Sequence, residues 1–175
     1  MKYAFEKPES VYSRLALYLT KRSKLTREIL ETLIAMDSPY TMEILRLAID
    51  KANYNINKKN DEGQTLLTYS LKKYSESESK IEKLNLMKVV NCLLDCGIDV
   101  DIPDENGQTA LHHCVFTNNL ILFDELLGKH PNINATDALG KSPLFYLGNN
   151  MKNPMRIAFD IYAKKRNIIP VKFKI

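Results

Sequence analysis

The stretch DENGQTALHHC, residues 104–114, combines two adjacent histidines, a cysteine and two acidic residues within eleven positions. Taken alone, this mixture is compatible with a metal site or a catalytic centre. However, its part ENGQTALHHC aligns without gaps with DEGQTLLTYS (61–70) and with ALGKSPLFYL (138–147). Three residue types then coincide in all copies: Gly63, Gly107 and Gly140; Thr65, Thr109 and Ser142; Leu67, Leu111 and Leu144. A repeated unit therefore has to be considered before a chemical site.

The spacing of these segments gives the period of the repeat. Gly107 and Gly140 are 33 residues apart, whereas Gly63 and Gly107 are 44 apart, which is one period plus an insertion of 11. The segments that follow repeat as well, because VVNCLLDCGIDVDIPDENG (89–107) matches LILFDELLGKHPNINATDALG (120–140). Several positions that recur at 33 and 44 residues favour a solenoid of stacked units.

Each recurring residue type has a physical role in such a unit. A glycine permits a left-handed or tight-turn backbone, and a Thr or Ser two residues later can cap a helix by accepting a backbone N–H. Pro143 suits the first position of a helix. The run VVNCLL (89–94) has apolar residues at helical spacing and predicts a second helix. Gly97 is placed to end that helix in the left-handed conformation, and His130 holds the matching place one period later.

This pattern resembles the ankyrin-repeat family, whose units read approximately D-x-x-G-x-T-P-L-H-x-A followed by V-x-x-L-L-x-x-G-A-x-V-N. The core of that signature reads TLLT at 65–68, TALH at 109–112 and SPLF at 142–145, so no unit carries all four signature residues. The resemblance covers about residues 40–165. It implies an all-α fold, an ankyrin-repeat solenoid of about three to four helix-turn-helix repeats with β-hairpin-like fingers and divergent helical caps.

We expect a single domain over residues 1–175. From the N-terminus on, its parts are divergent helices or a cap (1–39), a partial repeat (40–60), two repeats (61–103 and 104–136), a last repeat or cap (137–168) and a tail (169–175). Within the first part we expect helices near 9–22 and 26–36, and within the last repeat a helix at 154–168. The insertion falls near 74–85, around SESES (75–79). We expect a solvated loop there, with or without a lengthened first helix, because the segment is polar and of low complexity. Its serines are candidates for phosphorylation.

The composition indicates one globular domain without covalent staples. A chain of 175 residues with 45% hydrophobic and 26% charged residues can bury a core of its own. Three cysteines, an odd number, argue against a disulfide framework and favour a reducing compartment. No segment has the length of a signal peptide's apolar run or of a membrane helix. We therefore expect a monomeric cytoplasmic protein, or one that acts in a host-cell cytoplasm if it is a delivered effector.

The charge is unevenly distributed along the chain. Residues 1–60 carry a net charge of +4, residues 61–128 of −7 and residues 129–175 of +7. An acidic middle between basic ends suits polar protein partners. The basic clusters are short, so nucleic-acid binding through the ends stays a weaker alternative.

The cysteines and histidines offer another alternative, a metal-binding or enzymatic protein. Cys92 and Cys96 are four apart and would share one face of a helix, where His112 or His113 could join them as ligands. A nucleophile built from Cys114 and His113 is less favoured, because adjacent side chains on a helix diverge by about 100°. The sequence contains no CxxC pair and no phosphate-cradling glycine motif. We therefore expect no cofactor, no bound metal and no enzyme activity.

The resemblance implies a concave protein-binding face, formed by the fingertips and the first helix of each unit. Two rows of candidate protein-binding residues lie on it: Tyr69, His113 and Tyr146, which we expect to be exposed, and, three positions further on, Lys72, Phe116 and Asn149. Secondary candidates on the fingers are Asn57, Lys59, Asp101, Asp104, Asn134 and Asp137, of which Asp104 and Asp137 also suit turn formation.

The expected function is therefore a non-enzymatic module that binds a protein partner, as a scaffold, an inhibitor or a pathogen effector. The resemblance also implies a structural role for His112, which stands at the histidine of the signature and would hydrogen-bond between neighbouring repeats.

Overall fold

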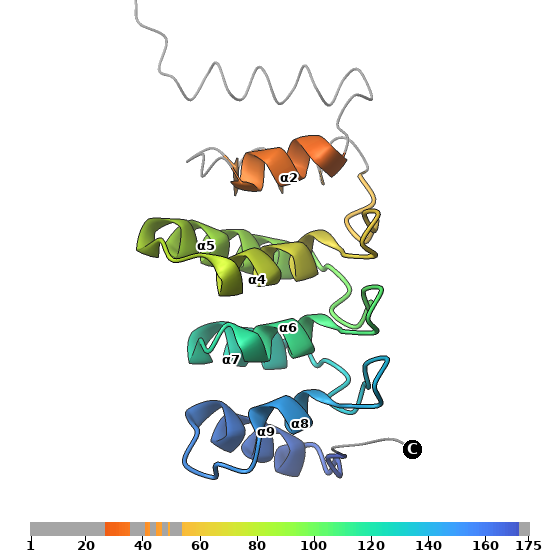
Figure 1. Cartoon of the computed structure of the whole chain (residues 1–175), viewed down its shortest axis with the longest axis vertical. Helices are drawn as coiled ribbons and strands as arrows, with labels where there is room; N and C mark the ends of the chain where they lie inside the picture. The colour runs from red at the N-terminus through yellow and green to blue at the C-terminus, as the bar shows by residue number, and fades with distance from the viewer. Residues whose placement is uncertain (1–26, 36–40, 43–44, 47–48, 50–53, 172–175) are drawn as a thin grey trace, which may run out of the picture.

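The structure is a computed structural model that describes residues 27–35, 41–42, 45–46, 49 and 54–171. The continuous helices within these residues are α2 (Arg27–Ala35), α4 (Leu66–Glu76), α5 (Lys80–Asp95), α6 (Ala110–Phe116), α7 (Leu120–Gly128), α8 (Pro143–Leu147) and α9 (Pro154–Lys165). Figure 1 shows them stacked in successive layers, with the turns between layers on one side. None of these helices is long and apolar enough to cross a lipid bilayer.

The helices form antiparallel pairs that stack in two rows. The pairs are α4 with α5, α6 with α7, and α8 with α9, and the first helices α4, α6 and α8 also pack on one another. The second helices α5, α7 and α9 form the other row. Leu67, Leu111 and Leu144, which coincide in the alignment, are all buried. Burial of a leucine contributes about 1.5–3 kcal/mol to the stability of the fold. Because these leucines are buried where neighbouring pairs stack, each pair depends on its neighbours for a shared, continuous core.

The turns that project beside the first helices are built alike. They are the first finger (60–64), the second finger (104–108) and the third finger (137–141). In the second finger the Gly107 N–H donates to the Asp104 carbonyl at 3.1 Å, and the Asp104 N–H donates to the Gln108 carbonyl at 2.9 Å. The other two fingers repeat both bonds. Gly63, Gly107 and Gly140 have φ angles of 69°, 73° and 71° and so occupy matching places in successive units, as the alignment predicts.

Neighbouring fingers also touch through their backbones. The Ala138 N–H donates to the Asn106 carbonyl at 2.8 Å. A Cβ atom on Gly107 would lie 2.9 Å from the Ala138 nitrogen, and one on Gly63 would lie 2.8 Å from the Glu105 nitrogen. Glycine is required at these two positions both by the left-handed backbone and by the close approach of the next finger.

The expected helix starts are observed at Thr65 and Pro143. The Thr65 hydroxyl accepts the Thr68 N–H at 3.3 Å, as predicted for a cap. Pro143 occupies the first turn of α8, also as predicted. The prediction of a hydroxyl cap is wrong for Ser142, because its hydroxyl donates to the carbonyl of Val171 in the tail instead.

Two second helices end as the sequence predicts. After α5, Gly97 has a φ of 77°, and the following N–H, of Ile98, donates back to the Leu93 carbonyl at 3.2 Å. After α7, His130 takes the same left-handed conformation with a φ of 63°. A residue with a Cβ therefore occupies a position that favours glycine.

The insertion is helical, so the prediction of a solvated loop near 74–85 is wrong for most of its length. Helix α4 has 11 residues where α6 has 7, and α5 has 16 where α7 has 9, so the 11 extra residues lengthen both helices. Only residues 77–79 connect the two helices. Ser79 caps α5 by accepting the Glu82 N–H, and Tyr74 and Leu86 are buried. The apolar residues of this segment therefore add to the core. Their burial favours helices although most of the segment is polar.

The ends of the chain agree with the prediction as far as they are described. The helix expected at 26–36 is α2, and the one expected at 154–168 is α9. The helix expected at 9–22 lies outside the described residues.

Candidate protein-binding surface

His113 does not have the exposed side chain that the sequence predicts. It is 7% exposed, and its Nε2 lies 2.8 Å from Oδ2 of Asp104 in the second finger. The other carboxylate oxygen of Asp104 accepts the N–H groups of Asn106 and Gln108, both at 2.9 Å. Asp104 is therefore the turn former that its residue type predicts, and its second oxygen ties the finger to α6.

The same link recurs one period later. Asp137 accepts the N–H groups of Leu139 and Lys141 at 2.9 Å with one oxygen, and its other oxygen accepts the Tyr146 hydroxyl from α8. Asp104 and His113 are nine residues apart, as are Asp137 and Tyr146. In the first unit Asn60 forms the turn in the same way, and Tyr69, nine residues later, is half-buried against the core. His113 and Tyr146 of this row therefore hold their fingers in place, whereas Tyr69 packs against the core.

The electrostatics of these links favour the charged carboxylates. Burial raises the pKa of Asp104, but the hydrogen bonds from His113 and from the turn N–H groups outweigh it, so the net shift is downward. The pKa of Asp137 is lowered in the same way, against burial, by the Tyr146 hydroxyl and the turn N–H groups. Burial and the bond to Asp137 raise the pKa of Tyr146 to about 12. Tyr146 is thus a neutral donor at physiological pH.

The second predicted row lies further out. The Phe116 side chain at the end of α6 is 44% exposed, Lys72 is half-buried on α4, and Asn149 is exposed beyond α8. The Phe116 and Tyr146 rings pack edge to face with centroids 5.2 Å apart. Lys141 places its ammonium 5.9 Å from the centroid of the Tyr146 ring. Aromatic side chains that are fixed by neighbours and open to solvent are common at the centre of protein interfaces.

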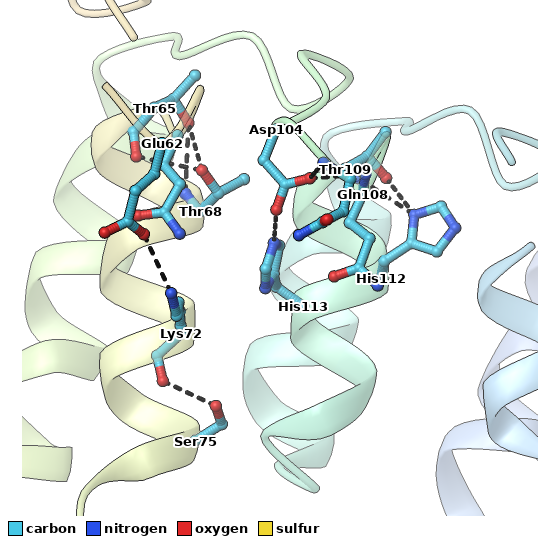
Figure 2. A network of polar contacts seen from close by, with 12 residues as sticks. Glu62, Thr65, Thr68, Lys72, Ser75, Asp104, Gln108, Thr109, His112 and His113 are labelled. Carbon is cyan, nitrogen blue, oxygen red and sulfur yellow. Dashed lines mark hydrogen bonds and ion pairs between the residues drawn. The ribbon is translucent and has the colours of Figure 1, made fainter. Parts of the chain in front are cut away.

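An open groove of about 500 Å3 adjoins this aromatic pair, between the first two fingers and helices α4 and α6. The buried part of its lining consists of Gln64, Asp104 and His113. Its more exposed lining includes Glu62, Lys72, Glu105 and Phe116. Figure 2 shows Glu62 paired with Lys72 of α4, and Asp104 paired with His113 of the neighbouring helix α6. The structure thus brings together Lys72, His113 and Phe116 from the predicted rows.

Two exposed surfaces of the stack are named by their helices. The first-helix face consists of this groove, the Phe116–Tyr146 pair and the exposed side of α4, α6 and α8. The second-helix face is the exposed side of α7 and α9, which carries Ile121 and Ile161.

The segments that precede the fingers in the sequence are also joined to one another. Asn57 accepts the Asp99 N–H at 2.9 Å, and Asp101 accepts the Asn132 N–H at 2.8 Å. Asn134 accepts the N–H of Val171 in the tail at 2.9 Å, so the tail takes the place of a further finger. These three secondary candidates are structural in the described part of the chain, whereas Lys59 is exposed.

His112 has the structural role that the resemblance implies. It is fully buried, and its Nδ1 accepts the Thr109 N–H at 3.1 Å. Because Nδ1 is an acceptor, the proton is on Nε2, which donates to the Lys141 carbonyl in the next unit at 3.1 Å. Burial lowers the pKa of His112, so the ring is neutral and joins two repeats.

The alternative of a chemical site finds no support in the geometry. Cys92 and Cys114 are buried and Cys96 is half-buried, all as thiols rather than disulfides. Burial raises the pKa of Cys114 to about 12, whereas a reactive cysteine needs a lowered pKa. In the part of the chain that the structure describes, no three His, Cys, Asp or Glu residues form a group that could hold a metal ion.

A family model for ankyrin repeats, in three copies, matches residues 32–137 and 80–153. The chain belongs to the ankyrin-repeat family. Ankyrin repeats generally act as protein–protein interaction modules and are typically non-enzymatic. No curated protein matches the chain significantly. The family assignment agrees with the all-α stack and with the matching places of its three finger glycines.

The finger-to-helix bonds are the feature that the sequence interpretation missed. A signal for them was present, because an acidic residue precedes His113 and Tyr146 by nine positions in both units. A finger carboxylate that uses one oxygen for its turn has a second oxygen available for a donor on the following helix.

Proposed function

We propose that this ankyrin-repeat protein is a non-enzymatic module that binds a partner protein on its first-helix face. The observation that carries the proposal is the exposed Phe116 ring, held by Tyr146 beside an open groove. Lys72 and Asn149 extend this face on either side of the aromatic pair. Tyr69 and His113 stabilise this face from its buried side. The sequence instead predicts that His113 contacts the partner directly.

The rigidity of this face supports the proposal. Asp104 and Asp137 tie two fingers to α6 and α8, and His112 joins the second unit to the third. A partner would therefore meet a preformed surface, and little conformational entropy would be lost on binding. A scaffold, an inhibitor that masks its target and a delivered effector would all use such a surface.

We further propose that the protein acts in a reducing compartment, either its own cytoplasm or that of a host cell. The support is that all three cysteines are free thiols. Recovery of the native protein only outside cells, in a disulfide-linked form, would contradict this location.

The binding face is tested by capture of partners from lysates of the cells that make the protein and of the host cells in which an effector would act. We compare the native chain with Phe116→Ser on the first-helix face and with Ile121→Ser on the second-helix face, where Ile121 is 62% exposed. Phe116→Ser should reduce recovery of the specific partner, with affinity at least about tenfold lower, whereas Ile121→Ser should not. Thermal unfolding verifies that both variants fold. Loss of the partner with Ile121→Ser but not with Phe116→Ser would place the interface on the second-helix face and contradict the proposal.

A further inference from the structure

The groove of the first-helix face has an acidic rim. Glu62 lies on the first finger and Glu105 on the second, and both are exposed. The cation in the lining is Lys72, whose Nζ lies 3.1 Å from Oε2 of Glu62. Asp104 adds a third carboxylate from the buried side. Residues 61–128, which supply this lining, carry 12 acidic and 5 basic residues.

The remaining lining suits a ligand that donates hydrogen bonds. Gln64 is 4% exposed and Asp104 is also buried, so polar groups of the protein form the inner wall of the groove. The Asp104 carboxylate accepts hydrogen bonds from Asn106, Gln108 and His113 and has acceptor capacity left. At the other side of the groove, the exposed Phe116 ring offers an apolar surface and the negative face of an aromatic system.

From this arrangement, and resting on the proposed function, we infer that the groove receives a basic side chain from an extended segment of the partner. The charged end of an arginine or lysine lies between Glu62 and Glu105, and its aliphatic stem lies against Phe116. Glu62 can change partners at little cost, because its ion pair with Lys72 is solvent-exposed, and such pairs contribute about 0–1 kcal/mol. The arrangement disfavours acidic segments and nucleic acids, whose negative charges would face the two rim carboxylates.

The test begins with selection of short random peptides displayed on phage against the immobilised full chain at physiological ionic strength. Binding of the selected peptides is then measured in solution against three purified variants. The double variant E62Q/E105Q removes the rim charges. The double variant E78Q/E125Q removes two exposed charges away from the groove and leaves the same net charge. Phe116→Ser reports on the first-helix face itself.

We expect the selected peptides to be enriched in arginine and lysine. Their affinity should fall by about tenfold or more in E62Q/E105Q, should stay within about twofold in E78Q/E125Q, and should weaken in Phe116→Ser. A single-stranded DNA oligonucleotide of mixed sequence should not compete with them.

The other outcomes separate the two proposals. Peptides that need Phe116 but lack basic residues, or that bind E62Q/E105Q as tightly as the native chain, would overturn the basic partner and leave the proposed function standing. Competition by the oligonucleotide would also overturn it. Peptides that bind Phe116→Ser unchanged, or a selection that yields no binder, would contradict the proposed function and the inference together.

Discussion

His112 and His113 are neighbours in the sequence and have different tasks in the fold. Consecutive side chains on a helix diverge by about 100°, so His112 faces the next repeat and His113 faces its own finger. Cys114 completes the run as a buried thiol. The group of residues that suggests chemistry in the sequence is therefore used for connections within the stack.

The neutral state of His112 predicts a dependence of stability on pH. Burial lowers its pKa in the folded chain below the ordinary value of 6.5, so the unfolded chain binds the proton more readily. The contribution of the neutral His112 ring to the free energy of unfolding is thus fully present above about pH 6.5. It is lost as the pH falls through the lower pKa of His112 in the folded state. Urea unfolding at pH 7.5 and at pH 5.5 should show a loss of unfolding free energy at the lower pH.

The control for this prediction is His112→Gln, which removes the titrating ring and leaves His113 and His130 in place. We expect the variant to be less stable at both pH values but to lose less stability between them. An equal loss in the native chain and the variant would show that His112 does not cause the dependence.

The roles of single residues were predictable where one residue type has one task. The turn formers Asp104 and Asp137 are examples. The bridging role of His112 was instead predicted from the resemblance to ankyrin repeats. The exposure of His113 was predicted wrongly, because helical spacing gives the direction of a side chain but not what covers it. The covering group is a carboxylate from the finger, and its reach to α6 depends on the turn that Asp104 itself forms.

Between helices, the main surprise is the insertion. Its polar run SESES suggests a loop, yet only three residues connect α4 and α5. Tyr74 continues the buried side of α4, and Leu86 continues that of α5. The Asn119 side chain, which caps α7, also donates to the Tyr74 hydroxyl at 2.7 Å. Apolar residues at helical spacing on both sides of the run were thus a better guide than its composition.

The ends of the second helices predict a reciprocal pair of substitutions. An L-residue in the left-handed conformation costs about 1–2 kcal/mol. Glycine avoids this strain, but it loses about 0.5–1 kcal/mol of stability because its unfolded chain is more flexible. His130→Gly should therefore raise the unfolding free energy by about 0.5–1 kcal/mol. Gly97→His should lower it by a similar amount.

Gly97 is a suitable counterpart because a Cβ there would meet no atom within 4 Å, so the backbone conformation alone is tested. Both variants are compared with the native chain by urea denaturation. If His130→Gly were destabilising by more than about 0.5 kcal/mol, side-chain contacts of His130 would outweigh its backbone strain, contrary to this account.

Across the stack, the repeat period was the most informative part of the sequence. Each unit buries its leucines against its neighbours, so the same apolar and glycine positions have to recur, and the all-α fold could be predicted. The lining of the first-helix face was harder to predict. It depends on how the fingers of adjacent units approach one another, which brings Glu62 and Glu105 to one groove although they are 43 residues apart.

Amide hydrogen exchange, measured by mass spectrometry on the full chain with and without a saturating selected peptide, tests the binding face most directly. We predict slower exchange in the second finger, in α6 and in the segment 143–149 when the peptide is bound. Exchange in α7 and α9 should be unchanged. Protection confined to α7 and α9, with α6 and the second finger exchanging as in the free chain, would contradict the assignment of partner binding to the first-helix face.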